Sequence, residues 1–190
     1  MSQELPTTSY AVLGLLTFGD ELTGYELKQR ADSTLRFYWV APAMSQVYSE
    51  LTRLTARGLV EPTTSAGAGR PTTTYRITDA GRSALSDWMA QSPTGFPVLK
   101  HSVLLRLLIG HMGEPERIRA MLEEYVAELA AARADLRGVR ESLRGADAPG
   151  EVFHYPSVVA DWGLDYFAAE ARHTRKAIDR LAVPTDSEEP

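Results

Sequence analysis

The stretch MSQVYSELTRLTARGLV, residues 44–60, decides the fold of this chain. Val47, Leu51 and Leu54 recur at the spacing of the buried side of an amphipathic helix. The opposite face is polar and consists of Ser45, Gln46, Ser49, Thr52 and Arg53. Gly58 ends the helix, and an extended segment follows. Small hydrogen-bonding groups beside an arginine suit the major groove of DNA, and an ordinary solvated helix face is the alternative interpretation.

Two strands joined by a glycine-rich loop are predicted next. Residues 60–64 and 72–78 alternate as strands do, and the sequence SAGAGRP, residues 65–71, lies between them. This loop lacks the spacing of a phosphate-binding loop and leads into a strand, so we reject that function. We expect Arg70 and Arg76 to contact phosphates beside the groove. For Arg70, the alternative is a solvated loop cation.

Helix signals flank this region on both sides. Ser9 is a candidate cap for a short helix from Tyr10 to Leu16, and a capping box at residues 23–26 opens a helix to about Arg30. Thr78 is a candidate cap for a fourth helix, whose inward face is expected to hold Leu85, Trp88 and Met89. The predicted order is three helices, a β-hairpin wing and a helix, which is a winged helix-turn-helix.

Several motifs keep a common order and spacing over about the first ninety residues: YAVLGLL (10–16), TGYEL (23–27), VYSELTRL (47–54), GLV (58–60) and GRP through YRITDAG (69–81). They resemble the PadR family of bacterial transcriptional regulators. The resemblance implies that Tyr48 and Ser49 lie at the DNA, although Tyr48 packing only against the wing is an alternative. It also implies dimerisation by C-terminal helices, and repression of the regulator's own promoter and often of an adjacent transporter or detoxification gene.

Composition limits the other classes of protein. The 190 residues suit one large or two small domains, and a hydrophobic fraction of 44% can form a core. The chain has no cysteine, which removes disulfides and thiolate chemistry. The apolar stretch Val103 to Ile109 is broken by Arg106 and is far shorter than the roughly 20 residues of a membrane span. Without a signal-peptide pattern, we expect a soluble cytoplasmic protein with no membrane partner.

The net charge of −5 opposes DNA binding at first sight. Within residues 44–78, however, four arginines oppose Glu50 and Glu61, a local surplus of +2. These arginines are Arg53, Arg57, Arg70 and Arg76. Binding depends on the local field at the phosphates rather than on the total charge.

A turn-rich linker, residues 91–97, separates the second half of the chain. We therefore expect a DNA-binding domain at 1–92, a helical dimerisation and effector domain at 93–184, and a disordered acidic tail at 185–190. The expected helices run from about Leu99 to Gly110, from Glu114-Pro115-Glu116 to the glycine at 145, and from about Ser157 to Leu181. The fold class is thus mainly α.

The long middle helix carries an unbroken heptad seam. Its members are Ile118, Leu122, Tyr125, Leu129, Ala132, Leu136, Val139 and Leu143. We assign a homodimer interface to Ile118, Leu122, Tyr125, Leu129 and Leu136, and packing within one chain is the alternative. Arg133, Arg137, Arg140 and Arg144 lie off the seam and are expected to be solvated.

Aromatic residues cluster where the two domains are expected to approach each other. They are Phe37, Tyr38 and Trp39 before the polar helix, and Trp162 and Tyr166 on the last helix. Flat rings are good walls for an apolar or aromatic ligand, and the resemblance places Trp39 first among them. Core packing is the alternative for both tryptophans.

No catalytic or metal motif is present in the sequence. The four histidines are widely spaced, and His173 with Glu170 is interpreted as a surface pair. There is no G-x-S-x-G elbow and no dinucleotide fingerprint, so we expect neither an enzyme nor a cofactor. We expect a ligand-responsive regulator, a repressor, that binds palindromic promoter DNA as a homodimer and is released by a small effector. The alternative is a helical adaptor that uses its winged helix for protein contacts.

Overall fold

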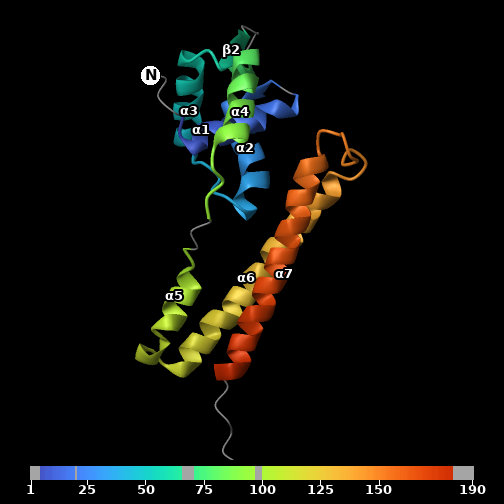
Figure 1. The fold of residues 1–190 in the computed structure, drawn as a ribbon. Coiled ribbons are helices and arrows are strands. Elements are labelled where there is room, and N and C mark those ends of the chain that lie inside the picture. Colours follow the sequence, from blue (N-terminus) through green and yellow to red (C-terminus); the bar gives the residue numbers. More distant parts are fainter. Residues whose placement is uncertain (1–4, 20, 66–70, 97–99, 182–190) are drawn as a thin grey trace, which may run out of the picture. The chain divides into compact units, whose positions relative to one another are not determined.

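The chain forms two compact units, residues 1–95 and 96–190, which divide a few residues beyond the expected boundary (Figure 1). The computed structural model describes residues 5–19, 21–65, 71–96 and 100–181. The expected acidic tail lies outside the described residues. Within those residues, no helix is both long and apolar enough to cross a membrane.

The N-terminal unit has the predicted winged helix-turn-helix order. Its elements are α1 (Thr7–Leu15), η1 (Leu16–Phe18), β1 (Leu22–Thr23), α2 (Gly24–Thr34), η2 (Leu35–Phe37), α3 (Met44–Ala56), β2 (Val60–Ser65), β3 (Thr72–Ile77) and α4 (Asp79–Gln91). The apolar seam of α3 is buried as predicted, because Val47, Leu51 and Leu54 pack into one core with α1 and α2.

Two of the three predicted helix caps are confirmed. The Thr23 hydroxyl accepts from the Glu26 N–H at 3.1 Å, and the Glu26 carboxylate accepts from the Thr23 N–H at 2.8 Å. Thr78 caps α4 by accepting from the Gly81 N–H at 3.1 Å. The prediction for Ser9 is wrong, because α1 begins earlier and Ser9 lies inside it, fully buried.

A third strand completes the wing. The two-residue β1 pairs antiparallel with β3, giving the sheet order β1-β3-β2 with Leu22 opposite Tyr75. Sequence periodicity could not reveal it, because two residues carry no alternation. The extra strand brings residues 21–23 to the outer edge of the hairpin.

Helix α4 covers the core with only part of its predicted inward face. Leu85 packs against the core, and the Trp88 ring stacks on Tyr10 with centroids 4.7 Å apart. The prediction for Met89 is wrong, since 72% of this residue is exposed. Met89 borders a shallow depression beside Thr17 instead of entering the core.

The C-terminal unit consists of helices: α5 (Ser102–Leu108), η3 (Gly110–Met112), α6 (Pro115–Ser142) and α7 (His154–Leu181). Helix α6 has Pro115 at its first position, as predicted. Figure 1 shows α6 and α7 side by side as a long hairpin.

The heptad seam joins α6 to α7 within one chain. Leu122, Leu129 and Leu136 are only 1%, 5% and 1% exposed. The facing side of α7 is built largely of small residues: Ser157, Ala160, Gly163, Ala171, Thr174 and Ile178 are buried there. Within one chain α7 thus covers these three leucines, which is the alternative given above, and a dimer role for the seam stays a prediction.

Arg140 is not the freely solvated cation that the sequence suggested. Its guanidinium donates to Asp147 at 2.7 Å and to Asp161 at 2.9 Å. The Asp147 carboxylate also accepts from the Gly145 N–H at 3.2 Å. These bonds tie the connection between α6 and α7 to both helices.

Candidate nucleic-acid interface

The first turn of α3 is closed by one of its own side chains. Ala43 at the N-cap has no side chain that can accept a hydrogen bond, but its N–H donates to Gln46 Oε1 at 2.9 Å. Ser45, Gln46 and Ser49 are all exposed, as predicted for groups that contact DNA. The Gln46 amide nitrogen therefore provides hydrogen-bond donors on this face.

Further along α3, two hydroxyl protons are used within the helix. Ser49 donates to the Ser45 carbonyl and Thr52 donates to the Tyr48 carbonyl, each at 2.9 Å. In this conformation both hydroxyl oxygens keep lone pairs for outside donors. The polar face thus combines a donor at position 46 with acceptors one and two turns later.

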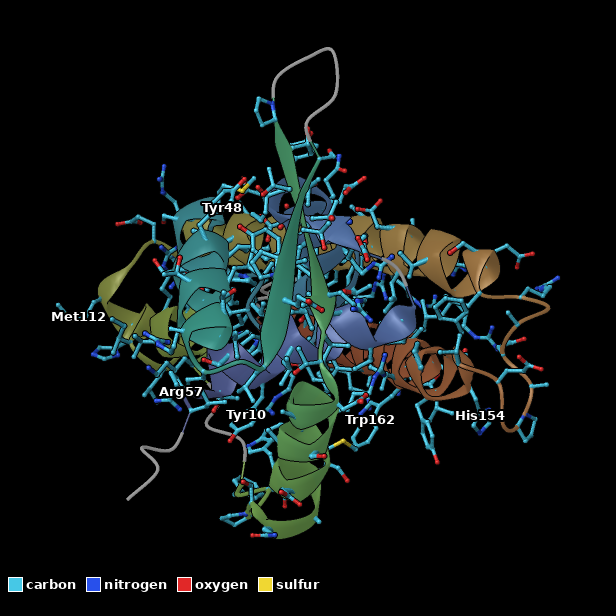
Figure 2. The ribbon with its side chains drawn as sticks, turned by 90° about the horizontal axis from the view of Figure 1, so that it is seen from above. Tyr10, Tyr48, Arg57, Met112, His154 and Trp162 are labelled. Atoms are coloured by element: carbon cyan, nitrogen blue, oxygen red, sulfur yellow. The ribbon has the colours of Figure 1, made fainter. Side chains whose placement is uncertain are left out.

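Tyr48 covers the start of α2, the helix that precedes α3 in the helix-turn-helix. A Cβ atom built on Gly24 would lie 2.6 Å from Tyr48 Cε1, so a larger residue at position 24 would displace the ring. The residue is still 47% exposed, and Figure 2 labels it on α3. Tyr48 thus packs against the start of α2 and keeps about half of its surface exposed, and its contact with DNA stays a prediction.

Arg53 is held by an acidic neighbour on α3. Its Nη1 lies 2.5 Å from Glu50 Oε1, with 40% of the arginine side chain exposed against 9% of the glutamate side chain. The other carboxylate oxygen of Glu50 accepts from the buried Ser9 hydroxyl. From the sequence alone Glu50 is only a countercharge to the arginines, because its burial depends on packing against α1.

The base of the wing is less positive than its sequence suggests. Arg76 is exposed but lies 2.8 Å from a Glu61 carboxylate oxygen and 3.7 Å from one of Glu21. Glu21 also accepts from the Thr74 hydroxyl at 3.0 Å. Counting Glu21 lowers the local surplus from +2 to +1. The predicted phosphate contact at Arg70 lies outside the described residues.

The aromatic residues predicted for an effector site belong to different units. In the N-terminal unit, Tyr38 is 50% and Trp39 is 37% exposed, and the Arg36 guanidinium stands 4.5 Å from the centre of the Phe37 ring. On α7, Trp162 is 75% and Tyr166 is 45% exposed. Core packing is therefore excluded for Trp162 in the single chain. The shallow depression bordered by Met89 contains none of these residues.

A polar cluster that sequence analysis missed lies inside the C-terminal unit. His101 Nε2 is 2.8 Å from Glu170 Oε1 and 3.1 Å from the Tyr125 hydroxyl. The other ring nitrogen of His101 accepts from the Leu104 N–H and so caps α5. Burial, followed by the Glu170 charge, raises the pKa of Tyr125 to about 12. Glu170 is thus paired across the helices, where the sequence suggested a surface pair with His173.

The apolar side of α5 is exposed in the single chain. Its large exposed residues are Leu104, Leu105 and Leu108, followed by Ile109 and Met112. A contiguous apolar surface of this kind is uncommon on a monomer and indicates an interaction site. Among the described residues, no cluster of histidine and acidic side chains is arranged to hold a metal ion.

Two family descriptions match consecutive parts of the chain. Residues 12–87 match the transcriptional regulator PadR-like family, and residues 99–182 match the virulence activator alpha C-terminal domain. The chain thus carries a PadR-like domain followed by a virulence activator alpha C-terminal domain. The family and the relatives that resemble this chain are transcriptional regulators.

Relatives and solved structures agree with this family. The negative transcriptional regulator PadR of Bacillus subtilis is 29% identical over 74% of this chain and 76% of its own. A PadR-like regulator from Bacillus cereus has a TM-score of 0.78 at 24% identity, covering 95% of this chain and 99% of its own. Bacillus subtilis PadR in complex with operator DNA has a TM-score of 0.80 at 22% identity, covering 93% and 99%. These structures share the fold of this chain.

Proposed function

We propose that this PadR-like regulator is a repressor that binds palindromic promoter DNA as a homodimer in the bacterial cytoplasm and is released by a small aromatic or apolar effector. The observation that carries the proposal is the exposed polar face of α3, with Ser45, Gln46 and Ser49 at its N-terminal end. Residues at the start of a recognition helix are those that contact base edges in helix-turn-helix proteins. The operator-bound relative from Bacillus subtilis supports DNA as the partner.

DNA binding is tested with a labelled duplex from the regulator's own upstream region and a random duplex of equal length. Gln46→Ala should weaken operator binding by about 1–3 kcal/mol and leave random binding unchanged. Gln46→Glu is the control, because it keeps an acceptor for the Ala43 N–H but has no donor. If Gln46→Glu binds the operator as well as the unmodified protein does, the side chain at position 46 only stabilises the start of α3 and does not read bases. Absence of any operator preference in the unmodified protein favours the adaptor function.

The arginines of the wing should increase affinity for all DNA sequences equally, as phosphate contacts do. Arg70→Ala should reduce binding to all duplexes and lower the slope of log affinity against log salt by about 0.9 for each phosphate that this arginine neutralises. Arg76→Ala should have a smaller effect, because Glu61 and Glu21 already engage that guanidinium. An unchanged slope in Arg70→Ala removes that residue from the interface.

Dimerisation is assigned to the C-terminal unit, supported by the exposed apolar side of α5. Leu105 is 62% and Leu108 is 77% exposed in the single chain. Leu105→Glu with Leu108→Glu should give a folded monomer that no longer prefers the operator, measured by light scattering and circular dichroism. A variant that stays dimeric would place the interface elsewhere.

The effector is tested through the exposed tryptophans. The Bacillus subtilis PadR structure with p-coumaric acid supports planar aromatic acids as the first compounds to try. Such a compound should quench tryptophan fluorescence and release DNA over the same concentration range, and Trp39→Ala should abolish both effects. Trp162→Ala and Tyr166→Ala test whether α7 contributes. Quenching without DNA release argues against an effector role.

A further inference from the structure

Glu50 is a buried charge in the middle of α3, which is an unusual place for a carboxylate. The residue is 7% exposed, and its neighbours on the same side of the helix are the core residues Val47, Leu51 and Leu54. A charge removed from water is costly unless it is paired and hydrogen-bonded. Here both carboxylate oxygens have partners, one from α1 and one from α3 itself.

One oxygen faces inward. Ser9 of α1 is fully buried, and its hydroxyl donates to Glu50 Oε2. The hydrogen bond joins residues 41 positions apart and fixes the carboxylate to a helix that does not belong to the helix-turn-helix pair. The bond from Ser9 therefore restricts the Glu50 side chain to one rotamer.

The other oxygen faces the surface. Arg53 Nη1 lies 2.5 Å from Glu50 Oε1, while 40% of the Arg53 side chain stays exposed. A guanidinium has five N–H donors in a fixed fork, so this bond leaves other donors for an outside acceptor. The Arg53 guanidinium is thus partly exposed to solvent, and its bond to Glu50 fixes its orientation.

We infer that Glu50 is a positioning residue that pre-orients Arg53 for DNA, using Ser9 of α1 as its anchor. The inference rests on the proposed function, because it assumes that α3 contacts DNA. A free arginine loses side-chain freedom when it is immobilised at an interface, and pre-orientation avoids that loss. The repulsion between the carboxylate and the phosphates is reduced, because Glu50 is buried and paired with Arg53.

A double-mutant cycle on operator affinity tests this inference. Glu50→Ala should weaken operator binding about three- to tenfold, the range that corresponds to ordering one long side chain. In an Arg53→Ala background the same change should have no further effect. Glu61→Ala is the charge-matched control, since it removes an exposed acid beside Arg76 and should not weaken binding.

The outcomes separate this inference from the function on which it rests. Equal losses from Glu50→Ala in both backgrounds would show that Glu50 only supports the fold, and a gain in affinity would make it a repulsive charge; either result overturns the inference. If Arg53→Ala itself leaves operator affinity unchanged while the unmodified protein binds, the inference fails but the proposed DNA-binding function stands, since that function is tested separately at Gln46. If Glu50→Ala does not fold, Glu50→Gln replaces it, because a carboxamide retains an acceptor but no charge.

Discussion

The packing of Leu136 against Gly163 gives a quantitative test of the α6–α7 hairpin. Leu136 is 1% exposed, and Leu136→Ala should cost about 2–5 kcal/mol of unfolding free energy, from reduced burial and the cavity that remains. A Cβ atom at position 163 would lie 2.7 Å from Leu136 Cδ2. Gly163→Ala should therefore cost about 1–3 kcal/mol through overpacking, partly offset by about 1 kcal/mol of helix propensity.

Combining the two changes should cost less than the sum of the single effects, because the new methyl group enters the space that the leucine vacates. We expect a coupling of about 0.5–3 kcal/mol, measured by urea unfolding followed through circular dichroism. The matched control is Gly138→Ala, a site on α6 where an added Cβ meets no atom within 4 Å. Strict additivity would refute the packing of Leu136 on Gly163. Dissociation of a folded dimer by Leu136→Ala, without loss of stability, would instead place the seam between chains.

Three further predictions follow from single interactions. Gly24→Ala should displace the Tyr48 ring and cost about 1–3 kcal/mol, and adding Tyr48→Ala should remove most of that cost in thermal unfolding. Thr78→Ala should cost about 0.5–2 kcal/mol through loss of the α4 cap, with Thr78→Ser as the control in urea unfolding. The hydrogen bond from Arg140 lowers the pKa of Asp147, so the stability from this carboxylate is present above its ordinary pKa and is lost as the pH falls through the lower folded value. Asp147→Asn should reduce the fall of unfolding free energy with decreasing pH below about pH 4. If this fall is the same in the variant and the unmodified protein, the Arg140–Asp147 pair does not contribute to stability.

Sequence patterns predicted the helices of the N-terminal unit because their signals are local. The apolar spacing in α3, the capping box at Thr23 and the cap at Thr78 each involve residues within one or two turns. Contacts between distant segments could not be predicted this way. Ser9 with Glu50 and Glu21 with Arg76 depend on how α1 and β1 pack, which no periodicity encodes.

The second half shows that a heptad pattern does not identify the helix that packs against it. The heptad seam of α6 was recognised, but a seam has the same sequence whether the opposing helix belongs to the same chain or to another. The decisive signal lay in α7, where Ala160, Gly163 and Ala171 form the buried side. The large rings Trp162 and Tyr166, from which an effector site is predicted, lie on the exposed side of that helix.

The bond between the Gln46 side chain and the Ala43 N–H constrains how this regulator can diverge from its relatives. Position 46 serves both the folding of α3 and its outer surface, so a substitution that changes one changes the other. Only glutamine and glutamate among the common residues reach back to the N-cap as a capping box requires. No hydrogen bond of the Ser45 side chain is described at the helix start, so a substitution at position 45 should cost less stability. Paralogues with altered operator preference should therefore accumulate changes at position 45 before position 46, and changes at 46 should be accompanied by a Ser, Thr or Asp at position 43.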